Sequence, residues 1–202
     1  MYINAIFHSG CPSSSLAAEP IDFNERKCPT CMQKIDRNDP KWTINRLPSP
    51  IMGTQLEAAA SIVIKPSNGH FRSYKIGDDL HIGICDSRGV VTSFWTNGVV
   101  SEKDTWHKCV VLVDLRPYFF ENMENLDNCI EFFVETEKMT KRFHKSKYRE
   151  TTWNCFDFVL EFLKFINFRS NYSKIDFSRE FSTKKVQNVV KYCTLYEKLR
   201  ME

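Results

Sequence analysis

The order of its apolar patterns constrains the fold of this chain more than any other feature. Four runs rich in valine, isoleucine and leucine predict strands at residues 61–65, 79–86, 90–94 and 107–115. After Pro117 the apolar residues recur at intervals of three and four, which predicts helices beginning near residues 117, 155 and 183. Strands that precede helices along the chain indicate an α+β domain with a mostly antiparallel sheet.

A proline-rich stretch divides the 202-residue chain into two parts. Residues 1–52 are rich in proline, serine and asparagine and lack sustained periodicity. Pro48 and Pro50 each fix their own backbone angle and keep the preceding residue out of the helical region, so residues 46–50 are interpreted as a linker. We therefore expect a small N-terminal module at 1–52 and an α+β domain at 53–202.

Two pairs of potential metal ligands lie in the N-terminal part. Residues 28–31 have the sequence Cys-Pro-Thr-Cys, a pattern of the zinc-knuckle type in which a tight turn points two thiolates at one ion. The second pair, at residues 8 and 11, precedes the first at a spacing that is typical of zinc ribbons. A module with so little apolar content needs an additional cross-link, such as a bound metal ion, to fold. We expect a structural Zn²⁺ bound by His8, Cys11, Cys28 and Cys31, with an unliganded, reduced pair as the alternative.

Residues 153–158, Trp-Asn-Cys-Phe-Asp-Phe, place a cysteine at the start of an apolar helix. Asn154 is a favoured N-cap residue, since its side chain accepts hydrogen bonds from the first turn. Cys155 would then be the first helical residue, where free N–H groups and the positive end of the helix dipole favour the thiolate. Cys155 also shares a helical stripe with Val159 and Leu163, so packing as a small core residue is the alternative.

The strand predicted at residues 79–86 carries a single histidine, His81. Because side chains alternate along a strand, His81, Gly83 and Cys85 point to the same face. Glycine beside the histidine removes bulk, which would let the end of a helix approach closely. We therefore predict a pair formed by the Cys155 thiol and the His81 imidazole, with a packed, non-catalytic histidine as the alternative.

Together these segments resemble the circularly permuted papain-like group, which includes lecithin retinol acyltransferase-like and PPPDE-type proteins, relatives of NlpC-type hydrolases. In that group the histidine strand precedes the cysteine helix, as it does here. Within it, most of the chain is similar to the makorin opposite-strand protein family. The shared features are an early Cys-Pro-x-Cys pair, an Asp-Leu-His-x-Gly-Ile strand, a Gly-Val-Val strand, an Asn-Cys helix and a late Thr-Leu-Tyr helix. The resemblance implies a permuted papain-like antiparallel sheet packed on helices.

Carried over residue by residue, the resemblance makes Cys155 the nucleophile and His81 the general base. The third polar position, which orients the imidazole, falls near Ser93, where the acyltransferase-like members have a histidine. The implied chemistry is acyl transfer, or hydrolysis of an amide, ester or thioester. The Cys155 thiolate would attack a carbonyl, His81 would protonate the leaving group, and N–H groups at the helix start would stabilise the oxyanion.

Serine is a weak orienting group, so a second function stays open beside the cysteine hydrolase or acyltransferase. It is a catalytically inactive papain-like protein that serves as a binding or adaptor protein. The enzyme would act on a protein or a lipid-like acyl substrate, whereas the adaptor would bind a partner through its surface.

The distribution of charge and the number of cysteines limit the partners and the cellular compartment that we expect. Residues 138–202 carry 15 basic and 7 acidic side chains, but no stacking pattern or recognised motif accompanies them, so we do not expect nucleic-acid binding. No stretch approaches the ~18 apolar residues of a membrane span, and no signal peptide is evident. Eight cysteines without an export signal are expected to be thiols or metal ligands in a reducing cytoplasmic, or nuclear, compartment.

Overall fold

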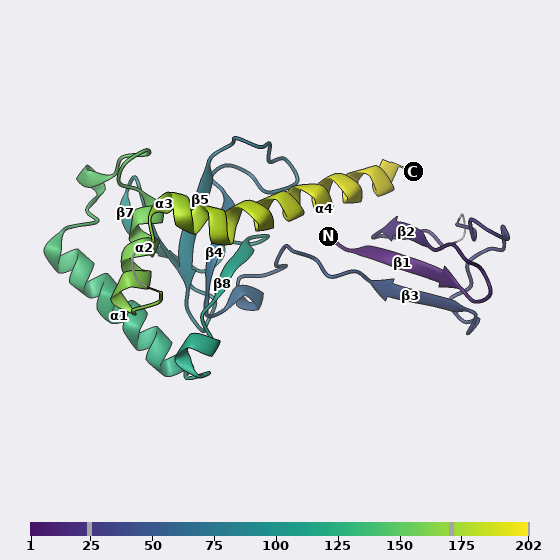
Figure 1. Ribbon diagram of the computed structural model, residues 1–202, viewed down its shortest axis with the longest axis horizontal. Helices are drawn as coiled ribbons and strands as arrows, with labels where there is room; N and C mark the ends of the chain where they lie inside the picture. Colours follow the sequence, from purple (N-terminus) through teal and green to yellow (C-terminus); the bar gives the residue numbers. More distant parts are fainter. Residues whose placement is uncertain (24–25, 170–171, 202) are drawn as a thin grey trace. The chain divides into compact units, whose positions relative to one another are not determined.

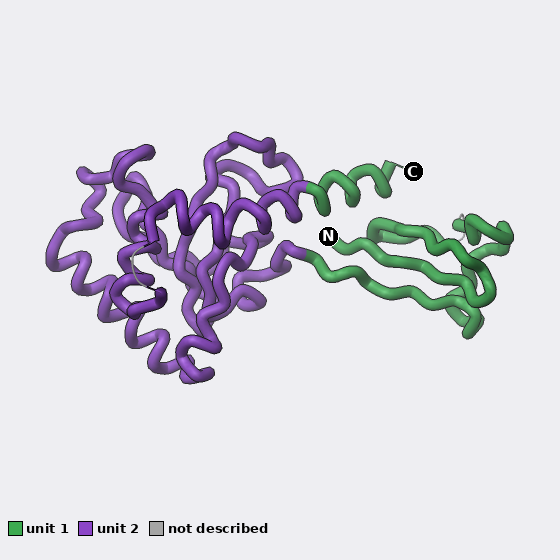
Figure 2. The backbone as a smooth tube through the Cα atoms, viewed as in Figure 1, with its two compact units in different colours: residues 1–49, 191–202 green, residues 50–190 purple. Residues whose placement is uncertain are grey.

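The computed structural model describes residues 1–23, 26–169 and 172–201, and its chain forms two compact units (Figure 1 and Figure 2). Unit 1 comprises Met1–Ser49 and Lys191–Glu202, and unit 2 comprises Pro50–Val190. The boundary at residue 49 falls within the predicted linker. One difference from the expected division is that the last residues of the chain belong to unit 1, because Tyr196 packs with Ile3 there and donates a hydrogen bond to the Glu19 carbonyl.

Unit 1 contains a three-stranded antiparallel sheet that the sequence patterns did not indicate. Its strands are β1 (Ile3–His8), β2 (Ser15–Ala18) and β3 (Trp42–Arg46), in the order β2-β1-β3. The small core beneath them includes Ile6, Ala17, Cys28 and Trp42. These strands are short, and β1 pairs with β3 across a long interval, so the sequence shows little periodicity there.

Unit 2 is built on a five-stranded antiparallel sheet in the order β7-β6-β5-β4-β8. Its strands are β4 (Ser61–Pro66), β5 (Leu80–Cys85), β6 (Val91–Trp95), β7 (Gly98–Glu102) and β8 (Val110–Asp114). The four strands predicted from the sequence are confirmed, and so is the α+β class. β7 was missed, because residues 96–98 indicated only a turn. Gly98, with φ of 104°, ends that turn and begins the strand.

The helices predicted near residues 155 and 183 are confirmed, whereas the helix predicted from residue 117 begins at Met123. They are α1 (Met123–Thr140), α2 (Cys155–Phe165), the single turn α3 (Lys174–Phe177) and α4 (Thr183–Met201), with short 3₁₀ turns η1 (Leu56–Ala58), η2 (Pro117–Phe119) and η3 (Lys145–Lys147) and a π-helical turn η4 (Ser178–Ser182). Pro117 opens only the short turn η2. Asn122 then caps α1, accepting a hydrogen bond from the Asn125 N–H. Among the described residues, no helix combines the length and apolarity needed to cross a membrane.

The two faces of the larger sheet have different coverings. On one face Phe94 contacts Phe143, which packs on Phe158 of α2, and α2 contacts both β5 and β6. On the other face, a cluster around Trp106 covers β4, β5 and β6; it consists of Ala58, Val63, Cys85, Val91, Trp106 and Cys109. Most of β5 is therefore buried from both sides.

Candidate functional site

Four side chains that could bind a metal ion converge in unit 1. His8 ends β1, Cys11 lies in the turn that follows it, and Cys28 and Cys31 flank a tight turn. Their ligand atoms all lie within 4.8 Å of one another. His8 Nδ1 is 3.4 Å from the sulfur of Cys11 and 3.2 Å from that of Cys31. The structure therefore brings together the four residues that the spacing singled out.

The surroundings of the cluster suit a metal ion. The His8 ring stacks on Trp42 of β3 with a centroid separation of 4.2 Å, which fixes the direction of Nδ1. The backbone N–H groups of Cys31 and Thr30 donate to the Cys28 sulfur and lower its pKa to about 6. Burial raises the pKa of the Cys11 thiol instead, and the adjacent cysteines add to that shift. Three sulfurs this close repel one another as thiolates, and a bound cation removes that repulsion.

The second predicted site begins at α2. The Asn154 side chain accepts a hydrogen bond from the Phe156 N–H at 3.0 Å, and the Asp157 carboxylate accepts one from the Asn154 N–H at 2.6 Å. This capping box confirms that Cys155 is the first helical residue. The residue, however, is only 3% exposed. Burial raises its pKa to about 11, against the smaller opposing effect of a hydrogen bond from the Ile82 N–H.

His81 lies on β5 and is 4% exposed. Its Nε2 is 3.1 Å from the Ser93 Oγ, which places Ser93 at the position predicted for it. The ring also contacts Trp95 edge-on at a centroid distance of 4.0 Å and lies 5.3 Å from Trp106. Burial, followed by the positive charge of Lys65, lowers the pKa of His81 to about 3. The imidazole is therefore neutral at physiological pH.

Within the described residues, neither ring nitrogen of His81 is hydrogen-bonded to Cys155. Nε2 contacts Ser93, and Nδ1 is buried without a partner. The sulfur of Cys155 instead lies at the backbone of the next residue, Ile82. The structure thus brings His81 and Ser93 together and places the thiol beside the same strand, but it does not join thiol and imidazole.

The side chain that fills the space beside His81 is not the one that we expected from the sequence. We expected Gly83 to admit the end of a helix. A Cβ at Gly83 would instead lie 2.6 Å from Val91 Cγ1 and 3.1 Å from Trp106 Cη2. That expectation was wrong because the glycine makes room for an indole ring. The body of α2 packs beyond Phe94, whose side chain alternates with that of Ser93 and points to the opposite face of β6.

Comparison with known proteins places the chain in a family. A family model described as DUF4796 C-terminal matches residues 44–199. The chain belongs to this family. It is also similar to the MKRN2 opposite strand protein of Homo sapiens, with 24% identity over 177 residues that cover 86% of this chain and 77% of the human protein. The resemblance to the makorin opposite-strand protein family is therefore confirmed. No solved structure gives a significant match to the chain.

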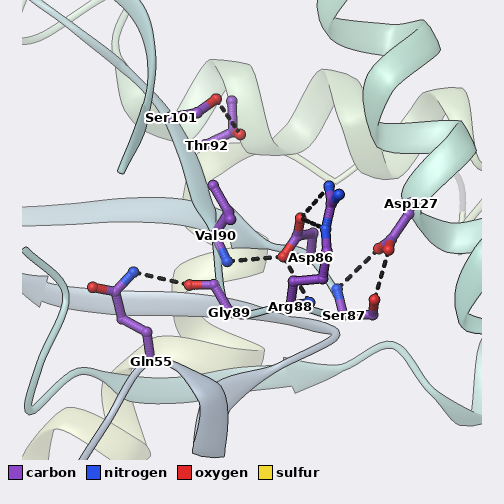
Figure 3. Close-up of polar contacts among 9 residues, drawn as sticks. All are labelled: Gln55, Asp86, Ser87, Arg88, Gly89, Val90, Thr92, Ser101 and Asp127. Atoms are coloured by element: carbon purple, nitrogen blue, oxygen red, sulfur yellow. Dashed lines mark hydrogen bonds and ion pairs between the residues drawn. The ribbon is translucent and has the colours of Figure 1, made fainter. Parts of the chain in front are cut away.

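A cavity that the sequence did not reveal lies between the β5–β6 turn and α1. It encloses about 590 Å³. Asp86, only 6% exposed, accepts hydrogen bonds from the N–H groups of Arg88 and Val90 and from the Arg88 side chain. Asp127 of α1 accepts two more from Ser87, and Figure 3 shows both carboxylates turned toward the same turn.

Proposed function

We propose that this protein is a non-catalytic binding protein that retains a permuted papain-like core. One observation carries the proposal: Cys155 is 3% exposed and its thiol is not hydrogen-bonded to His81, whose Nε2 contacts Ser93 instead. Nucleophilic cysteine chemistry needs a thiolate that is both accessible and activated by a neighbouring base. Neither condition is met by this pair of side chains.

The pKa values of Cys155 and His81 also support a non-catalytic protein. A thiolate–imidazolium pair requires a cysteine pKa below that of its histidine. Burial sets the opposite order here, with the pKa of Cys155 raised to about 11 and that of His81 lowered to about 3. At neutral pH both groups are uncharged, and no ion pair forms to activate the sulfur.

Access to the pair is also limited. Trp95 and Trp106 cover the His81 ring, and Tyr148 contacts Trp95. The four cavities described at the surface are lined by other residues than Cys155 and His81. A carbonyl substrate would have to displace packed aromatic side chains before it reached the sulfur.

The papain-like arrangement itself rests on the order of the site residues. His81 on β5, Ser93 on the neighbouring β6 and Cys155 at the start of α2 follow one another as in the permuted group. The hydrogen bond between His81 and Ser93 supports this alignment. We infer that the core keeps the architecture of a thiol enzyme while its packing serves stability.

A turnover experiment tests the proposal. The full chain and its Cys155→Ala variant are incubated with panels of thioesters, esters and peptides, and product release is followed. We expect the same background rate for both proteins, because the buried sulfur takes no part. Turnover by the wild type that is abolished in Cys155→Ala, in a variant that circular dichroism shows to be folded, would contradict the proposal.

A cysteine hydrolase or acyltransferase is the second candidate, and one observation favours it. The capping box fixes Cys155 at the helix N-terminus, and the Ile82 N–H reaches its sulfur. Such N–H groups are the kind that stabilise an oxyanion. This candidate predicts turnover that is lost in both Cys155→Ala and His81→Ala, whereas the binding protein predicts that neither change affects a rate.

For unit 1 we propose a structural Zn²⁺ held by His8, Cys11, Cys28 and Cys31. Three thiolates and one imidazole form a common donor set for tetrahedral structural zinc. Zn–S bonds of about 2.3 Å in a tetrahedron separate neighbouring sulfurs by roughly 3.8 Å, which fits ligand atoms within 4.8 Å of one another. The other cysteines are free thiols, in keeping with a reducing cytoplasmic or nuclear compartment.

A further inference from the structure

The chain around the end of α1 concentrates positive charge. Residues 138–149 contain six lysine and arginine side chains and no aspartate or glutamate. They comprise the last residues of α1, a short loop and η3, and most of them are exposed. Like charges held this close repel one another unless acidic groups of the protein or of a ligand neutralise them. The partners of each cation therefore show whether the protein itself supplies the neutralising charge.

The protein neutralises only part of this charge. Lys138 forms an ion pair with a glutamate one turn earlier in α1, and Arg142 bridges two glutamates, one in α1 and one in α2. Arg149 donates hydrogen bonds to two backbone carbonyls of its own segment. Within the described part of the chain, three lysines of the segment have no acidic partner: Lys141, Lys145 and Lys147. Their positive charge is available to a ligand.

A small cavity lies beside two of the unpaired lysines. It has a volume of about 210 Å³ and is lined by Lys141, His144 and Lys145 and by residues 97–99, where β6 turns into β7. Gly98, with φ of 104°, brings this turn against the loop, since a Cβ there would lie 3.8 Å from the Lys145 nitrogen. Typical small-molecule pockets measure about 300–1,000 Å³. The cavity therefore fits one compact group rather than a whole large ligand.

The uncompensated charge of this cavity is positive. Among the described residues, Glu137 is the one acidic side chain of its lining. It is 5% exposed, and both of its carboxylate oxygens accept hydrogen bonds from Arg142. Lys138 lines the cavity too, and its charge is neutralised by its own ion pair. Lys141 and Lys145 thus supply two ammonium groups whose charge no acidic group in the described part of the chain neutralises.

Further hydrogen-bond donors line the same cavity. The Ser146 N–H donates to Nδ1 of His144, so the neutral imidazole carries its proton on Nε2 and can donate it to an acceptor. The side-chain amide of Asn97 adds a donor at the turn. Phe143 fixes the loop, because it is 2% exposed and stacks on Trp153 at a centroid distance of 4.9 Å. The cavity therefore offers mainly donors to a ligand, on a loop that packs against the core.

We propose that this cavity binds the phosphate group of a phosphate monoester. Such a group carries a charge of about −1.5 to −2 at pH 7, which matches the two ammonium groups of Lys141 and Lys145. Its three free oxygens accept hydrogen bonds from these groups and from His144. A carboxylate or a phosphodiester carries a single negative charge and would leave one ammonium group unpaired. The site shares no residue with the Cys155–His81 pair, so the inference goes beyond the proposed function and is tested separately.

The kind of cation favours a phosphorylated small molecule or lipid headgroup over a phosphorylated protein segment. Phosphorylated segments are recognised mainly by arginine clusters, whose planar groups bind phosphate through two parallel hydrogen bonds. Here Arg142 is committed to Glu137 and Glu161, and the available cations are lysines, which bind phosphate as point charges. A soluble phosphate ester and the headgroup of a phosphorylated lipid offer the same chemistry to such a site.

NMR titration of the isotope-labelled full chain with glycerol phosphate tests the soluble form of the ligand. The amide signals of residues 97–98 and 144–145 should shift, whereas acetate at the same ionic strength should leave them unchanged. Flotation with phosphatidylcholine vesicles that contain phosphatidylinositol monophosphate tests the lipid form, against vesicles in which phosphatidylserine supplies the same charge. Preference for the phosphorylated lipid supports a headgroup ligand. Shifts with glycerol phosphate in the absence of vesicle binding support a soluble ester.

The double variant Lys141→Gln, Lys145→Gln should weaken either interaction about 25-fold, at about fivefold for each lysine. The control Lys184→Gln, Lys191→Gln removes the same charge from exposed positions of α4 outside the described cavities. It should bind as the wild type does, and both variants should keep the wild-type circular dichroism spectrum.

Three results would overturn the inference. The first is that neither glycerol phosphate nor the phosphorylated lipid binds more strongly than its control anion. The second is an equal loss of binding in the two double variants. The third is displacement of glycerol phosphate by a phosphoserine peptide at a hundredfold lower concentration, which would assign the cavity to a phosphorylated protein.

Discussion

Acidification should destabilise unit 2 through the imidazole of His81. In the folded protein burial lowers the pKa of His81 to about 3, whereas an unfolded histidine titrates near 6.5. The unfolded state therefore binds a proton between these values while the folded state does not. The resulting stability is fully present above about pH 6.5 and is lost as the pH falls toward 3.

The size of the effect follows from the width of that window. Each pH unit below 6.5 costs about 1.4 kcal/mol, so at pH 4.5 the contribution of His81 falls by roughly 2 to 3 kcal/mol. The His81→Gln variant keeps a hydrogen-bonding group for Ser93 but cannot titrate. Urea unfolding of both proteins at several pH values, followed by tryptophan fluorescence, gives the difference in unfolding free energy.

That difference isolates His81 from the other titrating groups. Wild type and variant carry the same cluster at His8, so the acid release of a metal from unit 1 affects both equally. Lys65 is the charged group that acts on the imidazole, and it is present in both proteins. A difference that is constant between pH 7 and 4.5 would refute the buried, neutral imidazole. So would a difference that begins to change above pH 7, which is expected of an imidazolium paired with a thiolate.

Two further predictions concern packing and the metal. Gly83→Ala should lower the unfolding free energy of unit 2 by about 1 to 3 kcal/mol, because the new Cβ meets Val91 and Trp106; unchanged urea midpoints would show that the indole does not occupy this space. The purified protein should contain about one Zn²⁺ per chain by metal analysis, and chelation or Cys28→Ser should change the fluorescence of Trp42, which stacks on His8. A metal-free protein with unaltered Trp42 fluorescence would contradict the structural role of the cluster.

Local signals made part of this architecture predictable. The cap at Asn154 and the spacing of apolar residues after it depend on interactions within one turn, so the start of α2 follows directly from the sequence. The same holds for the paired spacing of the four potential metal ligands in unit 1. The strands of the larger sheet contain enough β-branched residues to be predicted from the sequence.

The rest depends on contacts between distant segments. β1, β2 and β3 are short strands, and β1 pairs with β3 across a long interval, so little local pattern predicts this sheet. The burial of Cys155 and the position of Trp106 against Gly83 are likewise set by tertiary packing. A cysteine at a helix start looks the same in a sequence whether its sulfur faces solvent or the core.

Site-resolved alkylation of Cys155 tests the central claim most directly. The native protein is treated with iodoacetamide at pH 7.4, and each cysteine is quantified by mass spectrometry, with the half-buried Cys129 as the accessible reference and Cys85 as the buried one. With a pKa of about 11, less than about 0.1% of the Cys155 sulfur is thiolate at this pH. The account predicts that Cys155 reacts as slowly as Cys85 and becomes labelled only on unfolding, equally in wild type and His81→Gln. Labelling of native Cys155 faster than Cys129, and dependent on His81, would contradict it.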